Sequence, residues 1–189
     1  MKNKFVLIFL TALSLSATAA IQLKSNPKEG LVEFEAIGRP SMLKIKGTGE
    51  GVMADLKIDN NMLSGKIQFS LKSLKTGIEL RDEHMLTKYL QVDRFSEAQL
   101  VLTNSSLPKN FSLSTPGINN YPFKGILDLH GVKKEIAGNY SVDSAQLASN
   151  ASFEIKLSDF NIDIPSYLGV KVADIVKIKV AINKIVKVN

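Results

Sequence analysis

The sequence contains no cysteine among its 189 residues. This absence excludes disulfide bonds, thiolate metal ligands, thiol catalysis and a lipid-modified N-terminal cysteine. A chain of this length can nevertheless bury a sizeable core without covalent cross-links. We therefore expect side-chain packing and strand pairing to hold the fold together.

Histidine is almost as scarce, since only His84 and His130 occur. Their positions have no ligand spacing, so a metal site that combines them with Asp82 or Glu83 is not favoured. A serine triad would need one of these histidines, and the G-x-S-x-G motif of its nucleophile is absent. His130 stands beside a predicted hairpin bend and is expected to face outward. We predict no catalytic residues and no metal, and hence a protein that is not an enzyme.

Phosphate-binding loops and nucleic-acid surfaces are also missing. The glycine-rich stretch from Gly47 to Gly51 lies between two strand-like runs, without a following helix or a lysine–serine pair. It is more typical of a bulge or a kinked turn than of a phosphate loop. No basic patch carries interleaved aromatic residues, which argues against a nucleic-acid partner. The lysines near the end of the chain alternate with apolar residues and indicate a solvated outer face.

Long apolar runs are confined to the first twenty residues. Lys2 and Lys4 precede an apolar run over residues 5–15, and Ala17-Thr18-Ala19 follows as a small-x-small cleavage site. This layout predicts a secretory signal peptide over residues 1–19. The run is shorter than the roughly 20 residues that a membrane-spanning helix needs. We expect a periplasmic protein whose domain covers residues 20–189 and has no transmembrane segment after signal cleavage.

The remainder of the chain alternates apolar and polar residues with period two. The alternating runs cover residues 32–36, 52–58, 66–72, 100–102, 127–130, 136–142, 153–157 and 176–182. Such alternation predicts antiparallel strands with one buried and one wet face. Asn60-Asn61 and His130-Gly131 are expected to form tight turns between strands. Residues 76–89 break the rhythm and predict one or two short helices. Pattern alone does not decide between a sandwich and a barrel.

The faces expected to point inward carry no charge. Small residues such as Ala36, Ala54 and Gly138 are mixed there with large ones such as Phe34 and Phe69. An eight-stranded barrel has an interior that side chains can fill or that holds one small ligand. The residues therefore leave two interpretations open: a hollow that takes an apolar ligand, and a packed barrel whose loops bind a partner.

The most notable polar pair is formed by Arg81 and Asp82. One interpretation is that it orients the polar end of a ligand. The alternative is that Asp82 caps a helical turn while Arg81 ties the loop to a neighbouring strand. We favour the structural interpretation.

Several motifs occur in an order that resembles the YceI family of exported, lipocalin-like barrels. They are S-L-K-T-G-I at residues 73–78, R-D-E-H-M-L at residues 81–86 and L-D-L-H-G-V-K-K at residues 127–134. The segments that resemble the family's closing strands, one of which contains Asp174, follow later in the chain. The resemblance covers nearly all of the chain after residue 19.

This resemblance implies an all-β fold: an eight-stranded antiparallel lipocalin-like barrel with a short helical insertion near residues 78–90. It also implies a carrier protein that binds a long-chain isoprenoid or another apolar small molecule inside the barrel. No cofactor is expected beyond that lipid, a polyisoprenoid or quinone-like molecule. The sequence does not decide between a monomer and a homodimer. The residues predicted to line the ligand site are Phe34, Phe69, Leu86, Leu100, Phe153, Phe160 and Tyr167.

Overall fold

The structure is a computed structural model that describes residues 20–39, 43–109, 111–113, 117–143, 147–167 and 170–188. Residues 1–19, which the sequence predicts to be a signal peptide, lie outside this part of the chain, as does the side chain of Tyr167. The described part is all-β apart from one short α-helix and a few single helical turns.

Twelve strands are formed by the described residues. They are β1 (Ile21–Ser25), β2 (Gly30–Arg39), β3 (Leu43–Glu50), β4 (Met53–Asp59), β5 (Met62–Ser70), β6 (Glu97–Ser106), β7 (Ile118–Leu129), β8 (Val132–Val142), β9 (Ser149–Lys156), β10 (Ser166–Tyr167), β11 (Val170–Ile182) and β12 (Ile185–Val188). The helical elements are the 3-10 turns η1 (Pro27–Glu29), η2 (Leu71–Ser73) and η4 (Leu157–Phe160), the α-helix α1 (Glu79–His84) and the π-helix η3 (Met85–Tyr89).

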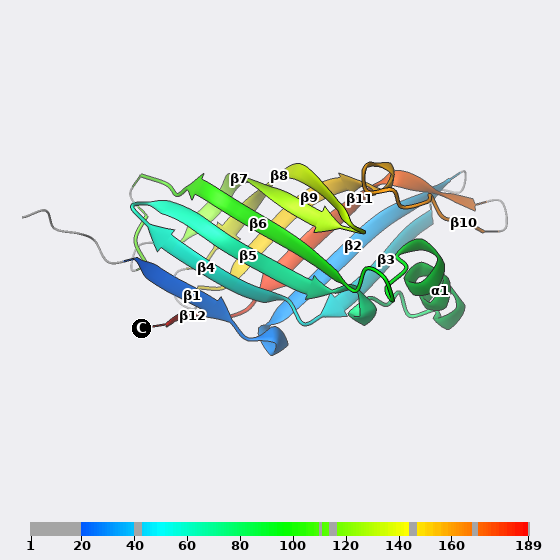
Figure 1. Ribbon diagram of the computed structural model, residues 1–189, viewed down its shortest axis with the longest axis horizontal. Helices are drawn as coiled ribbons and strands as arrows, with labels where there is room; N and C mark the ends of the chain where they lie inside the picture. The colour runs from blue at the N-terminus through cyan, green and yellow to red at the C-terminus, as the bar shows by residue number, and fades with distance from the viewer. Residues whose placement is uncertain are drawn as a thin grey trace, which may run out of the picture.

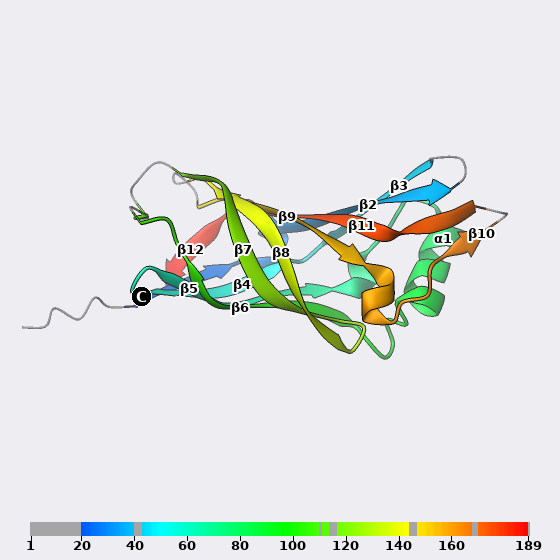
Figure 2. The ribbon, with the colours of Figure 1, turned by 90° about the horizontal axis from the view of Figure 1, so that it is seen from above.

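All strand pairs in the sheet are antiparallel, as the alternation predicts. The hydrogen-bonded order is β12-β1-β4-β5-β6-β7-β8-β9-β11-β2-β3, and β10 pairs with β11 beside this path. Figures 1 and 2 show the sheet curling about the long axis of an elongated molecule. α1 and β10 lie at one end, and β12 lies near the other (Figure 1).

The prediction of eight strands closed into a barrel is wrong in its count and in its closure. The structure shows a curled sheet whose path begins at β12 and ends at β3. Kinks divide three extended stretches of chain into two strands each: β1 and β2, β3 and β4, and β11 and β12. A period-two pattern reports which residues face inward and does not reveal such breaks, so the sequence-based count was too low.

The three kinks lie side by side. The Gly51 amide donates to the Gly30 carbonyl over 3.0 Å, and the Asn183 amide donates to the Glu29 carbonyl over 2.8 Å. Gly51 has a φ of 99°, a conformation that glycine adopts at little cost. A Cβ atom on Gly30 would come within 2.4 Å of the Val52 carbonyl oxygen, so the close approach also requires glycine there.

The predicted turns and the helical insertion are confirmed. Asn60 and Asn61 both have positive φ between β4 and β5, and His130 and Gly131 do the same between β7 and β8. Two consecutive residues with positive φ suit a tight turn that joins twisted antiparallel strands. α1 and η3 fall within residues 78–90. No helix in the described ranges combines the length and the hydropathy that a membrane span requires.

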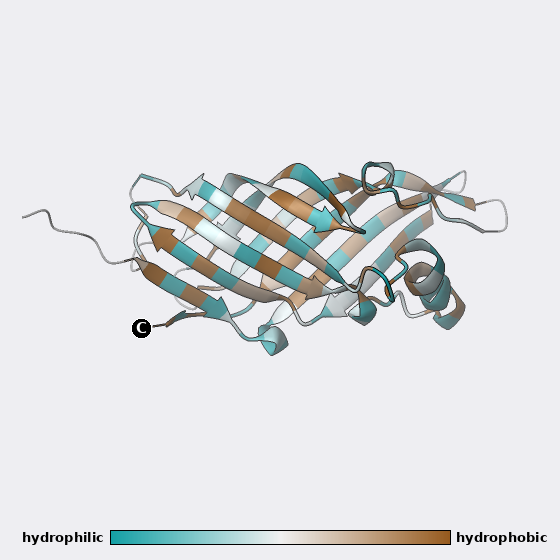
Figure 3. Ribbon diagram, viewed as in Figure 1, coloured by the Kyte–Doolittle hydropathy of each residue, from teal (hydrophilic) through white to brown (hydrophobic). Residues whose placement is uncertain are grey.

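Apolar and polar bands alternate along the strands, as Figure 3 shows. The buried apolar residues form one connected cluster that includes residues of most strands and of η2 and η4. The exposed residues of the long strands are mainly charged or polar, as at Lys171, Lys177 and Lys179 of β11. The alternation read from the sequence therefore corresponds to an apolar interior and a wet outer surface.

The turn η4 is fastened to β11 by a carboxylate. Asp174 accepts a hydrogen bond from the Ser158 amide over 2.9 Å and another from the Ser158 hydroxyl over 2.7 Å. These bonds favour the charged form, and they lower the pKa of Asp174 below its ordinary value. A carboxyl whose pKa is lowered by folding stabilises the fold above its unfolded pKa and loses that contribution as the pH falls.

We expect Asp174→Ala to lower the free energy of unfolding by about 1 kcal/mol at pH 7, because charge-assisted hydrogen bonds are lost at a site that solvent partly screens. The difference from the parent protein should shrink as the pH falls from about 4, the ordinary pKa of aspartate, through the lowered folded value. Urea unfolding of both proteins at pH 7 and at pH 3 measures this. A difference that grows toward low pH would contradict the assignment.

Candidate functional site

The curled sheet encloses a cavity of about 630 Å³. This volume falls within the range of roughly 300–1,000 Å³ that is typical of ligand pockets. The wall is formed by residues of β2, β3, β5, β6, β7, β9 and β11, and by the segment that contains α1 and η3. No lining residue that comes from a strand carries a charge, which agrees with the uncharged inward faces expected from the alternation.

The cavity is long. Its lining residues on β11 run from Val170 at one end of the strand to Ile182 at the other. At about 3.3 Å per residue, these two residues lie roughly 40 Å apart along the strand. A space of this volume spread over that length is a narrow channel, which suits an extended chain better than a compact ring system.

Two glycines on β3 let aromatic rings lie close against the strand. A Cβ atom on Gly47 would come within 2.4 Å of the Phe34 ring, and one on Gly49 would come within 2.6 Å of the Phe69 ring. Phe34 and Phe69 both line the cavity. The glycines therefore place the aromatic part of the wall, because any larger residue would push the rings into the channel.

Polar lining residues are concentrated at one end. Within the described part of the chain they are Thr76, Arg81, His84, Tyr89, Ser149 and Ser166. The first four belong to the segment around α1 and η3, at the end of the molecule shown with α1 in Figure 1. The channel thus offers carbon along its length and hydrogen-bonding groups near one end.

Arg81 and Asp82 close the loop that carries α1. The Thr76 amide donates to Asp82 Oδ1 over 2.7 Å, and the Thr76 hydroxyl donates to the same oxygen. Arg81 Nε donates to Thr76 Oγ1 over 2.7 Å, and Arg81 Nη2 donates to the Thr76 carbonyl over 3.2 Å. The two residues therefore have a structural role, but not the one expected. Asp82 does not cap the helix, and Arg81 bonds to Thr76 in the same loop and not to a neighbouring strand. Arg81 also forms part of the cavity wall.

These hydrogen bonds give a structural role to the motifs that contain Thr76, Arg81 and Asp82. The family model described as the YceI-like domain matches residues 24–183. The chain belongs to the YceI-like domain family. The resemblance read from the sequence motifs is thereby confirmed.

Solved structures support the same fold. BcnA of Burkholderia cenocepacia has a TM-score of 0.65 at 17% identity, over 86% of this chain and 99% of that one. A polyisoprenoid binding domain from Saccharophagus degradans, implicated in plant cell wall breakdown, has a TM-score of 0.63 at 14% identity, over 85% and 96%. The Campylobacter jejuni YCEI protein has a TM-score of 0.52 at 17% identity, over 77% and 85%. No curated protein matches the sequence.

Four of the seven predicted site residues of this YceI-like domain lie together in the cavity wall. They are Phe34, Phe69, Leu100 and Phe153, from β2, β5, β6 and β9. The side chain of Tyr167 lies outside the described part of the chain. Contact of the four with a ligand stays a prediction.

Leu86 and Phe160 do not line the cavity, so their assignment to its wall is corrected. Phe160 is 1% exposed and belongs to the core, because the chain leaves the extended conformation at η4 and the alternation no longer gives the direction of its side chain. Leu86 packs against the core from η3. On this helical segment Met85 and Tyr89, four residues apart, face the cavity instead.

His130 is buried and does not face outward, which corrects the expectation from the sequence. It is 8% exposed, its Nδ1 lies 3.1 Å from the Phe160 carbonyl, and its ring packs against Phe95 at 4.3 Å between centroids. The positive φ of 53° turns the side chain inward from the hairpin, and alternation does not predict this direction. His130 therefore ties the β7–β8 turn to η4.

No cluster of three or more histidine, cysteine, aspartate or glutamate residues in the described ranges is arranged to hold a metal ion. The half-buried Tyr140 stays uncharged. Burial, together with Tyr121, raises its pKa to about 12, so its hydroxyl stays protonated near neutral pH.

Sequence reasoning missed several lining residues. Met85, Tyr89, Leu90, Ile162 and Val172 contribute to the wall, but they come from helical, loop or bulged segments. Alternate residues face the same side only in regular strands, so the period-two pattern does not give side-chain directions in such segments. For Met85 and Tyr89 the available signal was their position within residues 76–89, which break the alternation.

Proposed function

We propose that the protein is a periplasmic carrier that holds a long apolar amphiphile of polyisoprenoid type in its cavity. The observation that carries this proposal is the narrow channel along β11, whose strand-derived wall contains no charged side chain. Such a wall favours a guest made mostly of carbon, because a polar guest would lose its hydrogen bonds to water without replacement.

The energetics allow binding without dedicated polar contacts. Burying each CH₂ group contributes about 0.8 kcal/mol, so a chain of roughly 20 carbons gains on the order of 15 kcal/mol. Association and ordering cost about 4–15 kcal/mol. The balance ranges from about zero to about 11 kcal/mol in favour of binding, and each further isoprene unit that is buried increases it.

The position of the polar residues gives the cargo a direction. We infer that its polar end lies near Thr76, Arg81 and His84, and that its tail extends along β11 toward Ile182. Arg81 is held by Thr76 through two hydrogen bonds, so it is already ordered before a ligand arrives. An ordered cation loses less conformational entropy on binding, and it suits a polar or anionic head group.

Two further observations support the proposal. The similar structure from Saccharophagus degradans is described as a polyisoprenoid binding domain. The basic start, apolar run and small-x-small site of residues 1–19 are typical of export. A packed scaffold that binds a partner through its loops has no use for a channel of this length.

The test is organic extraction of the purified protein followed by mass spectrometry. We expect one long-chain species, or a homologous series, in near-equal amount to the protein. Protein that contains no extractable lipid, and that takes none up from a mixture of isoprenoid alcohols and quinones, would overturn the proposal.

A further inference from the structure

The most exposed large apolar side chains of the described residues lie at the mouth of the cavity. Ile78 is 54% exposed, Leu43 is 53% exposed and Leu80 is 49% exposed. All three belong to the cavity wall. The other exposed large apolar residues in the described ranges, such as Ile175 and Val186, do not line it. Exposed apolar surface is therefore greatest where the channel meets solvent.

Backbone pairing brings these three residues to one place. Thr48 on β3 and Lys75 form an isolated antiparallel bridge, with two hydrogen bonds of 2.9 and 2.8 Å. The chain after Lys75 thus runs beside the first half of β3, which begins at Leu43. Figures 1 and 2 show α1 and the start of β3 at the same end of the molecule as β10.

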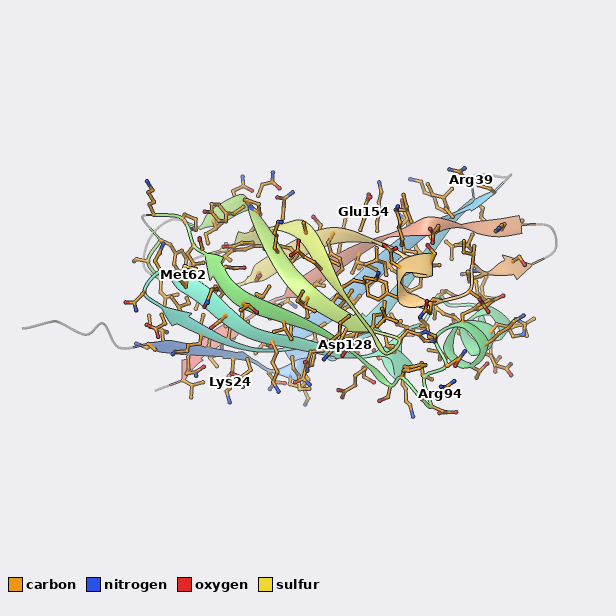
Figure 4. The ribbon with its side chains drawn as sticks, turned by 45° about the horizontal axis from the view of Figure 1, so that its top comes forward. Lys24, Arg39, Met62, Arg94, Asp128 and Glu154 are labelled. Carbon is orange, nitrogen blue, oxygen red and sulfur yellow. The ribbon has the colours of Figure 1, made fainter. Side chains whose placement is uncertain are left out.

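Exposed cations surround this opening. They are Arg39, Lys44, Lys75, Lys88 and Lys171, and none of them is in an ion pair with another described residue. Figure 4 shows Arg39 at this end of the molecule, far from Lys24 and Met62. Arg39 lies directly opposite Lys171 across β2 and β11, a like-charge pairing that is unfavourable without an anionic partner.

The exposed carboxylates nearest to the rim lie on α1. Glu79 and Glu83 are four residues apart on α1 and share one face of the helix. Arg81 and His84, on the other side of the helix, line the cavity. Exposed carboxylates are also present at Asp159 in η4 and at Asp163 in the segment before β10. The five exposed cations, together with Arg81 in the cavity wall, outnumber these four exposed carboxylates.

The part of the wall nearest this rim packs against the core only through partly buried side chains. Neither α1 nor η3 contains a buried residue. Gly77, just before Ile78, has a φ of 80°, and the space around it is open. Segments with few buried contacts open at low free-energy cost, so α1 and η3 can move while the sheet stays intact.

We propose that the rim formed by Leu43, Ile78 and Leu80, with the surrounding cations, docks onto the surface of an anionic lipid bilayer. The apolar side chains enter the outer part of the bilayer while the cations contact lipid phosphates. The same side chains continue into the channel wall, so a lipid tail passes between bilayer and cavity without crossing water. This passage of cargo rests on the proposed carrier function, whereas docking itself does not.

The test is flotation of the purified protein with vesicles of phosphatidylcholine alone or of phosphatidylcholine and phosphatidylglycerol in a ratio of about 7:3. The test variant carries Leu43→Ser, Ile78→Ser and Leu80→Ser. The control carries Ile175→Ser, Val186→Ser and Val188→Ser, which remove exposed apolar side chains that do not line the cavity. All proteins carry the same N-terminus, and thermal unfolding verifies that each is folded.

We expect the parent protein and the control to float with the anionic vesicles, and the rim variant to bind them at least tenfold more weakly. Arg39→Glu with Lys171→Glu should weaken binding to the anionic vesicles but not to the neutral ones. Added salt should likewise weaken binding of the parent protein to the anionic vesicles, because it screens the attraction between opposite charges. Equal binding by the rim variant and the parent, or an equal loss in the control, would overturn the proposal.

Lipid extraction from the same preparations separates the two proposals. A parent protein that contains lipid but does not bind vesicles would overturn docking and leave the carrier function standing. Vesicle binding by a protein that never contains lipid would overturn the carrier function and leave docking standing.

Discussion

Replacement of Ile178 by aspartate is expected to reduce the bound lipid at least 30-fold. Ile178 lies near the middle of β11, opposite Phe34 on β2 and Phe153 on β9, and all three line the cavity. A polar group buried against an apolar guest without a hydrogen-bond partner costs about 2 kcal/mol or more, and 1.4 kcal/mol corresponds to a factor of ten in affinity. A carboxylate at this position therefore weakens the binding free energy of any cargo that fills the channel by at least this amount.

The fold should tolerate this change better than most substitutions of interior residues. Ile178 is only partly buried, because it borders the cavity. In the empty protein, water that enters the channel can solvate the carboxylate. We therefore expect a folded protein that fails to hold lipid, as measured by circular dichroism and by lipid extraction with mass spectrometry.

A matched control is Ser152→Asp on β9. Ser152 pairs with Lys179, the residue after Ile178, and it is exposed on the outer surface. This variant adds the same charge a short distance away, outside the cavity, and should keep its full lipid content. Retention of lipid by Ile178→Asp, or its loss from both variants, would contradict the assignment of the channel as the binding site.

Phe160→Ala is expected to lower the free energy of unfolding by about 3–5 kcal/mol, as is typical of a fully buried aromatic residue. Phe160 is the largest side chain of the described residues that is less than 2% exposed. It lies in η4, which is held by Asp174 through Ser158 and by His130 through the Phe160 carbonyl. These hydrogen bonds hold the backbone in place, so the turn cannot collapse to fill the space that the ring leaves.

The measurement is urea unfolding of the parent, Phe160→Ala and Ile175→Ala. Ile175 is also an apolar residue of this region, on β11, but it is 46% exposed, so its truncation should cost well under 1 kcal/mol. Similar losses in the two variants would show that Phe160 is not a main support of the fold. Loss of lipid without loss of stability in Phe160→Ala would instead return this residue to the binding site.

The family motifs and the predicted binding residues differ in what they do. Thr76, Arg81 and Asp82 form a local hydrogen-bond network, and His130 ties one turn to another. Such roles need particular polar groups at particular positions, so they leave a readable motif. The channel wall needs only apolar residues that point inward, so it leaves alternation and no motif. The family was therefore recognisable from residues that mainly support the structure.

The sequence predicted side-chain directions correctly in regular strands and incorrectly in turns and helical segments. Phe34, Phe69, Leu100 and Phe153 come from regular strands, where alternate residues face the same side, and the structure places all four in the cavity wall. Phe160, Leu86 and His130 come from turns or helical segments, and the structure corrects the direction assigned to each. In such segments one backbone dihedral angle can reverse the direction of a side chain.

The sequence by itself determined the antiparallel all-β class, the uncharged inward faces, the tight turns and the helical insertion, because each depends on residues that are near one another in the chain. Only the tertiary structure decided that three stretches kink side by side, that the interior keeps a channel, and that the channel opens among Leu43, Ile78 and Leu80. Whether side chains fill an interior depends on how the sheet curls. That curl is a sum of twists and kinks over many strands, and no local pattern records it.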